Sequence, residues 1–122
     1  MYRRSVTRPP AERKIMAQKE DARCPVAASL EIIGERWTLL VIRDLLRLGP
    51  RKFQDFEAAL TGISPNTLSA RLKRLEEAGI VERRFYADHP PRAEYVLTEK
   101  GRALGPIVLA IKKWGEQYET GR

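Results

Sequence analysis

The sequence predicts a mainly α-helical fold that carries one small β-hairpin. Two observations support this class. Apolar residues recur at helical spacing from Pro25 onward, whereas the stretch after Gly79 loses this spacing and becomes rich in β-branched and aromatic residues. The length of 122 residues suits one domain of modest size together with a tail.

Three helices are expected in the first half of the domain. Pro25 suits a first helical turn, and Gly34 can end that helix. The second helix stops at the Gly49–Pro50 pair, and a short third helix covers about residues 53–60 before Gly62, a left-handed turn residue. The apolar positions that define these helices are Val26, Leu30 and Ile33, then Trp37, Leu40, Val41, Leu45 and Leu48, then Phe53, Phe56 and Leu60.

The fourth helix, from Ser64 to Ala78, has both ends and its buried face specified. Ser64 is a good N-cap, and Pro65 is a good first helical residue. Gly79 suits the left-handed position just after the helix, where Ile80 can pack back on its last turn. The narrow apolar stripe consists of Leu68, Leu72 and Leu75.

A β-hairpin and a last helix are expected next. Ile80–Ala87 and Ala93–Leu97 are the predicted strands, with residues 88–92 as a proline-bearing turn. Thr98 caps a helix over about 98–118, which Gly105–Pro106 should kink or restart. Its apolar seam steps by three and four residues, as in a coiled coil, and favours a homodimer: Leu104, Ile107, Ile111, Trp114 and Tyr118.

Residues 1–23 form a basic segment set apart from the domain at 24–122. They hold seven Lys and Arg against three Asp and Glu, with few apolar residues. Because such a segment cannot bury enough surface to offset its ordering entropy, we expect a flexible arm. Two interpretations stay open, an arm that binds nucleic acid and a solvated tail.

The charge of the whole chain favours a polyanionic partner. Lys and Arg number 23 against 16 Asp and Glu, which gives a formal net charge of +7. Nucleic acid is the first candidate partner, and an anionic membrane surface is the second. No apolar run approaches a membrane span or a signal peptide, so we expect a cytoplasmic protein with no membrane partner.

Residues suited to catalysis or metal binding are scarce. The chain has a single cysteine, Cys24, so an internal disulfide is excluded. With only one histidine, His89, beside it, the chain has too few ligands for most zinc sites. No phosphate-binding glycine loop and no triad-like set occurs. We therefore expect no catalytic site, no metal and no cofactor; an enzyme that used Cys24 as nucleophile would need His89, in the hairpin turn, as its base.

The order of helix, short turn, capped helix and hairpin indicates a winged helix-turn-helix, whose capped helix would read DNA. The polar face of that helix carries an amide suited to adenine, hydroxyls suited to phosphates or bases, and cations suited to guanine or phosphate. Its candidate DNA-contacting residues are Ser64, Pro65, Asn66, Thr67, Ser69, Ala70, Lys73 and Arg74. The wing adds Arg83, Arg84, His89 and Arg92 for backbone or minor-groove contacts.

Six segments follow one another in a characteristic order along the chain: Cys24–Val26, Gly34–Thr38, Ile63–Leu68, Arg71–Leu72, Leu75–Arg83 and Pro90–Thr98. Together they resemble the HxlR-type winged helix-turn-helix family, which is related to the MarR-type regulators. The resemblance covers about residues 24–118 and implies a transcriptional regulator that binds pseudo-palindromic double-stranded DNA as a homodimer. It also makes Cys24 a candidate sensor of oxidants or electrophiles.

Cys24 and the DNA-reading face each have an alternative interpretation. Cys24 lies between Arg23 and Pro25 near a helix start, where the guanidinium and the helix dipole favour the thiolate that oxidants attack. It can instead be a small residue packed beneath the first helix. The domain can likewise be a winged-helix module for protein interaction without specific DNA binding. The polar, basic helix face argues against that alternative, because protein-binding faces show apolar anchors.

Overall fold

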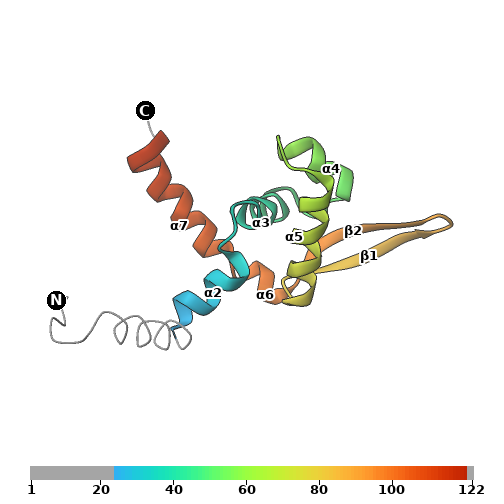
Figure 1. Cartoon of the computed structure of the whole chain (residues 1–122), viewed down its shortest axis with the longest axis horizontal. Coiled ribbons are helices and arrows are strands. Elements are labelled where there is room, and N and C mark those ends of the chain that lie inside the picture. The colour runs from blue at the N-terminus through green and yellow to red at the C-terminus, as the bar shows by residue number, and fades with distance from the viewer. Residues whose placement is uncertain (1–23, 121–122) are drawn as a thin grey trace, which may run out of the picture. The chain divides into compact units, whose positions relative to one another are not determined.

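The first described helix, α2, covers Pro25–Ile33 (Figure 1). The computed structural model describes residues 24–120, so the predicted N-terminal arm lies outside the described residues. The chain divides into two units between Gly34 and Glu35, which separates α2 from the larger unit. The N–H of Gly34 donates to the carbonyl of Leu30 at 2.8 Å and ends α2 where the sequence predicted.

The larger unit begins with three helices and continues into a two-stranded antiparallel ribbon (Figure 1). A broken C-terminal helix follows the ribbon, so the predicted class of helices with one hairpin is confirmed. The elements are α3 (Arg36–Leu48), α4 (Phe53–Ala59), α5 (Pro65–Glu77), β1 (Val81–Asp88), β2 (Pro91–Leu97), α6 (Glu99–Arg102), α7 (Gly105–Gly115) and η1, a π-helical turn (Glu116–Thr120).

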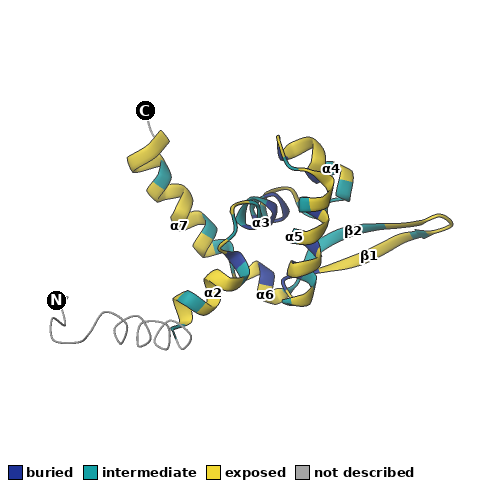
Figure 2. Ribbon diagram, in the orientation of Figure 1, coloured by how far each residue is buried: buried dark blue, intermediate teal, exposed yellow. Residues whose placement is uncertain are grey.

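The core of this unit lies among α3, α4, α5 and the base of the ribbon, where the buried positions gather in Figure 2. Phe56 of α4 meets the ring of Tyr95 on β2 edge to face, with centroids 6.2 Å apart. Burial of each large apolar side chain stabilises the fold by about 1.5–3 kcal/mol. The buried apolar set is Val41, Ile42, Leu45, Phe56, Leu60, Leu68, Leu72, Leu75, Ile80 and Val81.

The two ends of α5 confirm the sequence prediction. At its start, the Ser64 hydroxyl accepts a hydrogen bond from the Thr67 N–H at 3.1 Å. At its end, Gly79 adopts a φ of +75°, and the N–H of Ile80 donates to the Leu75 carbonyl at 2.9 Å. Because Ile80 takes part in this closure, β1 begins one residue later than the sequence predicted.

The hairpin has a shorter turn than the sequence predicted. Asp88, Pro91 and Arg92 were expected in the turn, but they pair in the ribbon and leave only His89 and Pro90 between the strands. The peptide bond between these two is cis. The ribbon accepts Pro91 because it is the first residue of its strand, where a missing N–H costs little.

The C-terminal helix restarts where Gly105 and Pro106 predicted an interruption. α6 ends at Arg102, and α7 begins at Gly105 with the proline in its first turn. A proline ring has no N–H to donate, so it suits the start of a helix better than its interior. Thr98 caps α6 as predicted, because its hydroxyl accepts from the N–H of Gly101 at 3.1 Å.

Candidate nucleic-acid interface

α5 presents a polar face on the side opposite its leucine stripe. Asn66, Ser69, Ala70 and Lys73 follow one another at i, i+3, i+4 and i+7, so they share one face of the helix. All four are exposed, and the three polar side chains make no hydrogen bond to another described residue. This face therefore offers an amide, a hydroxyl, a methyl and an ammonium to a partner.

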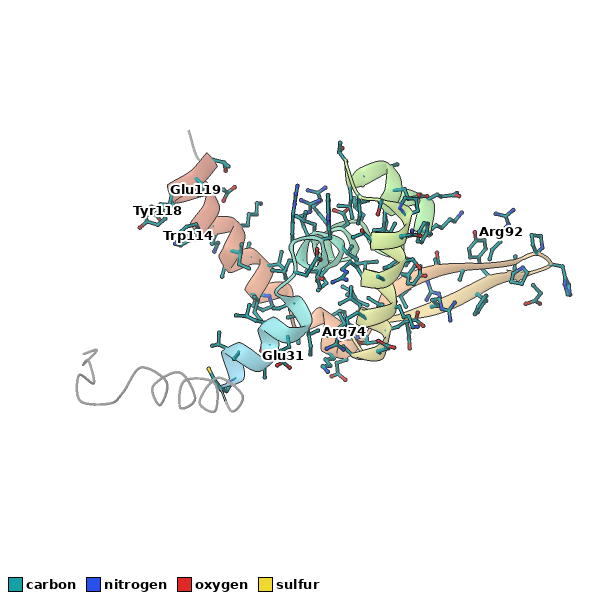
Figure 3. The ribbon with its side chains drawn as sticks, viewed as in Figure 1. Glu31, Arg74, Arg92, Trp114, Tyr118 and Glu119 are labelled. Atoms are coloured by element: carbon teal, nitrogen blue, oxygen red, sulfur yellow. The ribbon has the colours of Figure 1, made fainter. Side chains whose placement is uncertain are left out.

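The other predicted residues of α5 lie around this face. Ser64, Pro65 and Arg74 are exposed, whereas Thr67 is half-buried. The Ser64 hydroxyl donates to Thr67 Oγ1 at 2.9 Å in addition to capping the helix. Ser64 and Thr67 thus stabilise the start of the helix. Arg74 lies near the other end, in the last turns of α5 (Figure 3).

Two of the predicted wing residues are held by acidic neighbours. Arg83 Nε donates to Glu76 Oε2 at 3.1 Å, and Arg84 donates to Glu94 Oε1 from Nε at 3.2 Å and from Nη2 at 2.7 Å. Surface pairs of this kind contribute only about 0–1 kcal/mol to stability. They fix the orientation of the two guanidinium groups. The Arg83 pair also offsets the unfavourable interaction of the Glu76 carboxylate with the negative end of the α5 dipole.

The other two wing residues lie toward the tip of the ribbon. Arg92 projects from the far part of the hairpin, away from α5, in Figure 3. His89 occupies the turn, and both side chains are exposed. Neither forms an ion pair with a residue that the structure describes. The positive charge of Arg92 is thus directed to solvent.

Lys52 and the exposed aromatic residues of the wing were missed by sequence reasoning. Lys52 Nζ lies 4.9 Å from the centre of the Tyr86 ring, which links the start of α4 to β1. Arg83 lies 5.9 Å from the Phe85 ring. Phe85 and Tyr86 are 57% and 46% exposed, so the wing pairs aromatic with basic side chains. The sequence signal was present in the run of aromatic residues directly after two arginines.

The predicted dimerisation seam runs from the N-cap of α7 into η1, and most of it is exposed. Ile111, Trp114 and Tyr118 are 50%, 59% and 57% exposed, and Ile107 is exposed as well, whereas Leu104 is half-buried. The Trp114 and Tyr118 rings lie 5.5 Å apart on the side of α7 that points away from α3 (Figure 3). Exposed apolar patches of this kind are typical of interaction surfaces.

A groove of about 400 Å³ lies between α3 and α7. Its wall is mainly aliphatic, with Arg43 and Lys112 among its lining residues. Arg43 also donates to the carboxylate of Asp44 at 2.9 Å, and Asp44 is buried. Ile111 of the seam is one of the lining residues, so the groove adjoins the seam on the side of α7 that faces α3.

Cys24 is half-buried and is the N-cap residue of α2. Arg23, its predicted charged neighbour, lies outside the described residues. Residues 24–120 contain no group of three or more His, Cys, Asp or Glu side chains placed to hold a metal ion. No described helix is both long enough and apolar enough to cross a membrane.

Known proteins with similar sequences and structures are regulators. Residues 32–121 match the family described as HxlR-like helix-turn-helix. The HTH-type transcriptional regulator YdeP of Bacillus subtilis is 38% identical over 96 residues, which cover 79% of this chain and 74% of YdeP. Its name places it among regulators of transcription, not among enzymes.

Two of the solved structures that share the fold are described as regulators. The redox regulator HypR in its reduced form has a TM-score of 0.73 and 39% identity, covering 77% of this chain and 92% of HypR. The reduced form of the transcriptional regulator YodB from B. subtilis has a TM-score of 0.67 and 34% identity, covering 81% of this chain and 97% of YodB. The helix-turn-helix with its wing, and the match over residues 32–121, show that this chain belongs to the HxlR-like helix-turn-helix family of DNA-binding transcriptional regulators.

Proposed function

We propose that this chain binds a pseudo-palindromic DNA operator in a sequence-specific manner as a homodimer. The polar face of α5 carries the proposal, because Asn66, Ser69, Ala70 and Lys73 are exposed on one face of a well-capped helix. The major groove of B-DNA admits an α-helix, and these side chains match the groups on its base edges. Residues near the start of such a helix reach the bases.

Each side chain has a role in this arrangement. Asn66 can pair bidentately with adenine, Ser69 can bond a base or phosphate, and the small Ala70 leaves room for a thymine methyl group. Lys73 and Arg74 lie farther along α5 and bind phosphates. The wing residues Arg83, Arg84, His89 and Arg92 follow the adjacent backbone or minor groove. The net charge of +7 supports both sets of contacts.

The seam on α7 supports the homodimer. A two-fold axis along this seam covers the exposed Ile111, Trp114 and Tyr118 with the same residues of a second copy. The two α5 helices can then enter successive major grooves, which are about 34–36 Å apart on one side of the duplex. Such an arrangement requires an operator with two inverted half-sites.

Selection of bound duplexes from a random DNA library tests the proposal. We expect enrichment of an inverted repeat, and Lys73→Ala should weaken binding to it at least threefold. Arg47→Ala is the matched control, because it removes an exposed positive charge from α3 and should leave affinity unchanged. Recovery of unrelated sequences would contradict the proposal, and tight binding of a protein partner instead would favour an interaction module.

We further propose that modification of Cys24 lowers operator affinity. HypR is described as a redox regulator and has been solved in reduced and oxidized forms, and YodB has been solved after diamide treatment. The position of Cys24 at the start of α2 supports a similar response here. Because the chain has one cysteine, diamide can join Cys24 only to a thiol of another molecule. Two thiols then lose two electrons and two protons to the reagent as one S–S bond forms.

Operator binding before and after diamide treatment tests the role of Cys24. We expect the oxidised protein to bind the operator less tightly and a later reductant to restore binding. Cys24→Ser should bind the operator as the wild type does and ignore diamide. Unchanged affinity after complete oxidation of the wild type would show that Cys24 is structural.

A further inference from the structure

Three backbone carbonyls in the turn after α5 accept hydrogen bonds from the segment that begins α6. Lys100 Nζ donates to the Ala78 carbonyl at 2.7 Å. The Thr98 hydroxyl donates to the Gly79 carbonyl at 2.6 Å, and the Thr98 N–H donates to the Ile80 carbonyl at 3.0 Å. Three consecutive carbonyls thus bind a segment about 20 residues farther along the chain.

These contacts join the turn that ends α5 to the start of α6. The Ala78, Gly79 and Ile80 carbonyls follow Glu77, the last residue of α5, so none of them lies within the helix. The Thr98 hydroxyl serves both segments, because it donates to the Gly79 carbonyl in the turn after α5 and accepts from the Gly101 N–H at the start of α6. Gly101 is buried, and a Cβ at this position would collide with the Ile80 carbonyl oxygen. The backbones therefore approach too closely for a side chain at residue 101.

A short hydrogen-bonded path continues from this contact into α7. The N–H of Leu104 donates to the Gly101 carbonyl at 3.0 Å, and the N–H of Val108 donates to the Leu104 carbonyl at 3.0 Å. Only residues 103 and 104 separate α6 from α7. The end of α5 is thus bonded to the same run of backbone that carries the exposed seam.

We propose that Thr98, Lys100 and Gly101 are positioning residues that fix the direction of α5 relative to α7. This inference rests on the proposed function, in which α7 forms the dimer and α5 reads DNA. In that assembly the α5–α6 contact sets the separation and angle of the two recognition helices. The contact itself touches no DNA; it determines which half-site spacing the dimer accepts.

Operators with altered spacing test this role. The affinity of the full-length protein is measured for the selected operator, for versions with one base pair added or removed between the half-sites, and for a single half-site. We expect the wild type to prefer the selected spacing. Thr98→Val keeps the shape of the side chain but removes the hydroxyl, and should bind the selected operator about tenfold more weakly while its half-site affinity stays unchanged. Thr98→Ser retains the hydroxyl and should restore the spacing preference.

Lys100→Met is the second variant, because it removes a single exposed contact and keeps the aliphatic chain. It should lower the preference for the selected spacing about threefold. Lys113→Met is its matched control, with the same change of charge on the face of α7 opposite the seam. Urea unfolding of each variant establishes that the proteins compared are folded.

The outcomes separate this inference from the function on which it rests. Wild-type spacing preference in both Thr98→Val and Lys100→Met would overturn the positioning role and leave operator binding intact. Equal losses by a folded variant on the operator and on the half-site would also overturn it, because the contact would then affect DNA binding by each subunit and not the accepted spacing. A wild type that binds no inverted repeat would overturn the proposed function, and the inference with it.

Discussion

Asn66 and Arg92 are exposed polar residues on two different elements, and their removal should weaken DNA binding in different ways. Asn66→Ala should cost about 1–3 kcal/mol on the operator and nothing on unrelated DNA, because the amide reads a base edge. Ser69→Ala should likewise alter sequence choice. Titration of fluorescent operator and of random duplex measures both effects. Equal losses on the two DNAs for Asn66→Ala would show that another face of α5 meets the bases.

Arg92 should affect all duplexes alike. Its guanidinium lies toward the tip of the ribbon without an acidic partner among the described residues, so it is available for a phosphate. Arg92→Ala should weaken binding to the operator and to random DNA and lower the slope of log affinity against log salt by about one unit. Arg84→Ala should show a smaller loss, since Arg84 already binds Glu94 at 2.7 Å. A sequence-dependent effect of Arg92→Ala would contradict a phosphate contact.

Tyr95 gives a pH dependence that is independent of DNA. Burial of its phenol against the core raises its pKa above the ordinary value of 10.0; the nearby Arg83 lowers this pKa by a smaller amount, and Glu76 raises it. The folded state therefore keeps the proton at a pH where the unfolded chain has lost it. The resulting stability is present below about pH 10 and declines as the pH rises through the folded pKa. Urea unfolding between pH 8 and 11 should show a steeper decline for the wild type than for Tyr95→Phe.

At the scale of single elements, the start of α5 depends on one hydroxyl. Ser64→Ala should lower the free energy of unfolding by about 1 kcal/mol, because it leaves the Thr67 N–H without its capping partner. Ser69→Ala is the matched control, since the same change in the exposed middle of α5 should be neutral or slightly stabilising. Urea denaturation measures both variants. Equal effects at the two positions would show that the cap contributes nothing.

Elements with local determinants could be predicted from the sequence, and contacts between elements could not. Pro25, Ser64, Gly79 and Pro106 act within a few residues of themselves, and each marked a helix end where the structure places one. The hairpin turn was placed too broadly, because strand pairing of Arg92 depends on a partner across the ribbon. The candidate face of α5 followed from periodicity alone.

The ion pairs of the ribbon and the contact between the turn after α5 and α6 could not be predicted from the sequence, because they join segments that only the tertiary structure brings together. Glu76 lies at the negative end of the α5 dipole, and the Arg83 side chain that pairs with it comes from the ribbon. Thr98 was predicted only as a helix cap, because the sequence does not show that its hydroxyl also meets Gly79. Such contacts depend on the direction in which the chain returns after the hairpin, which local propensity does not specify.

For the whole molecule, the exposed seam of α7 predicts that the protein is a dimer in solution. The combined change Ile111→Glu and Trp114→Glu should produce monomers, because it places charge at the centre of an apolar contact. Sedimentation velocity at micromolar concentration measures the change. Lys113→Glu is the control on the opposite face of α7 and should remain a dimer. A wild-type monomer at that concentration would contradict the homodimer.

The open edges of the β1–β2 ribbon affect the solubility of the protein. Near its base, the Tyr95 backbone exchanges hydrogen bonds with Arg51, but the outer part of the ribbon has no third strand among the described residues. Its edges present unpaired N–H and carbonyl groups, which are templates for adding strands from other copies. Charged side chains on both strands and Pro91 oppose such stacking. The arginines expected to hold DNA therefore also protect the free protein from aggregation through its wing.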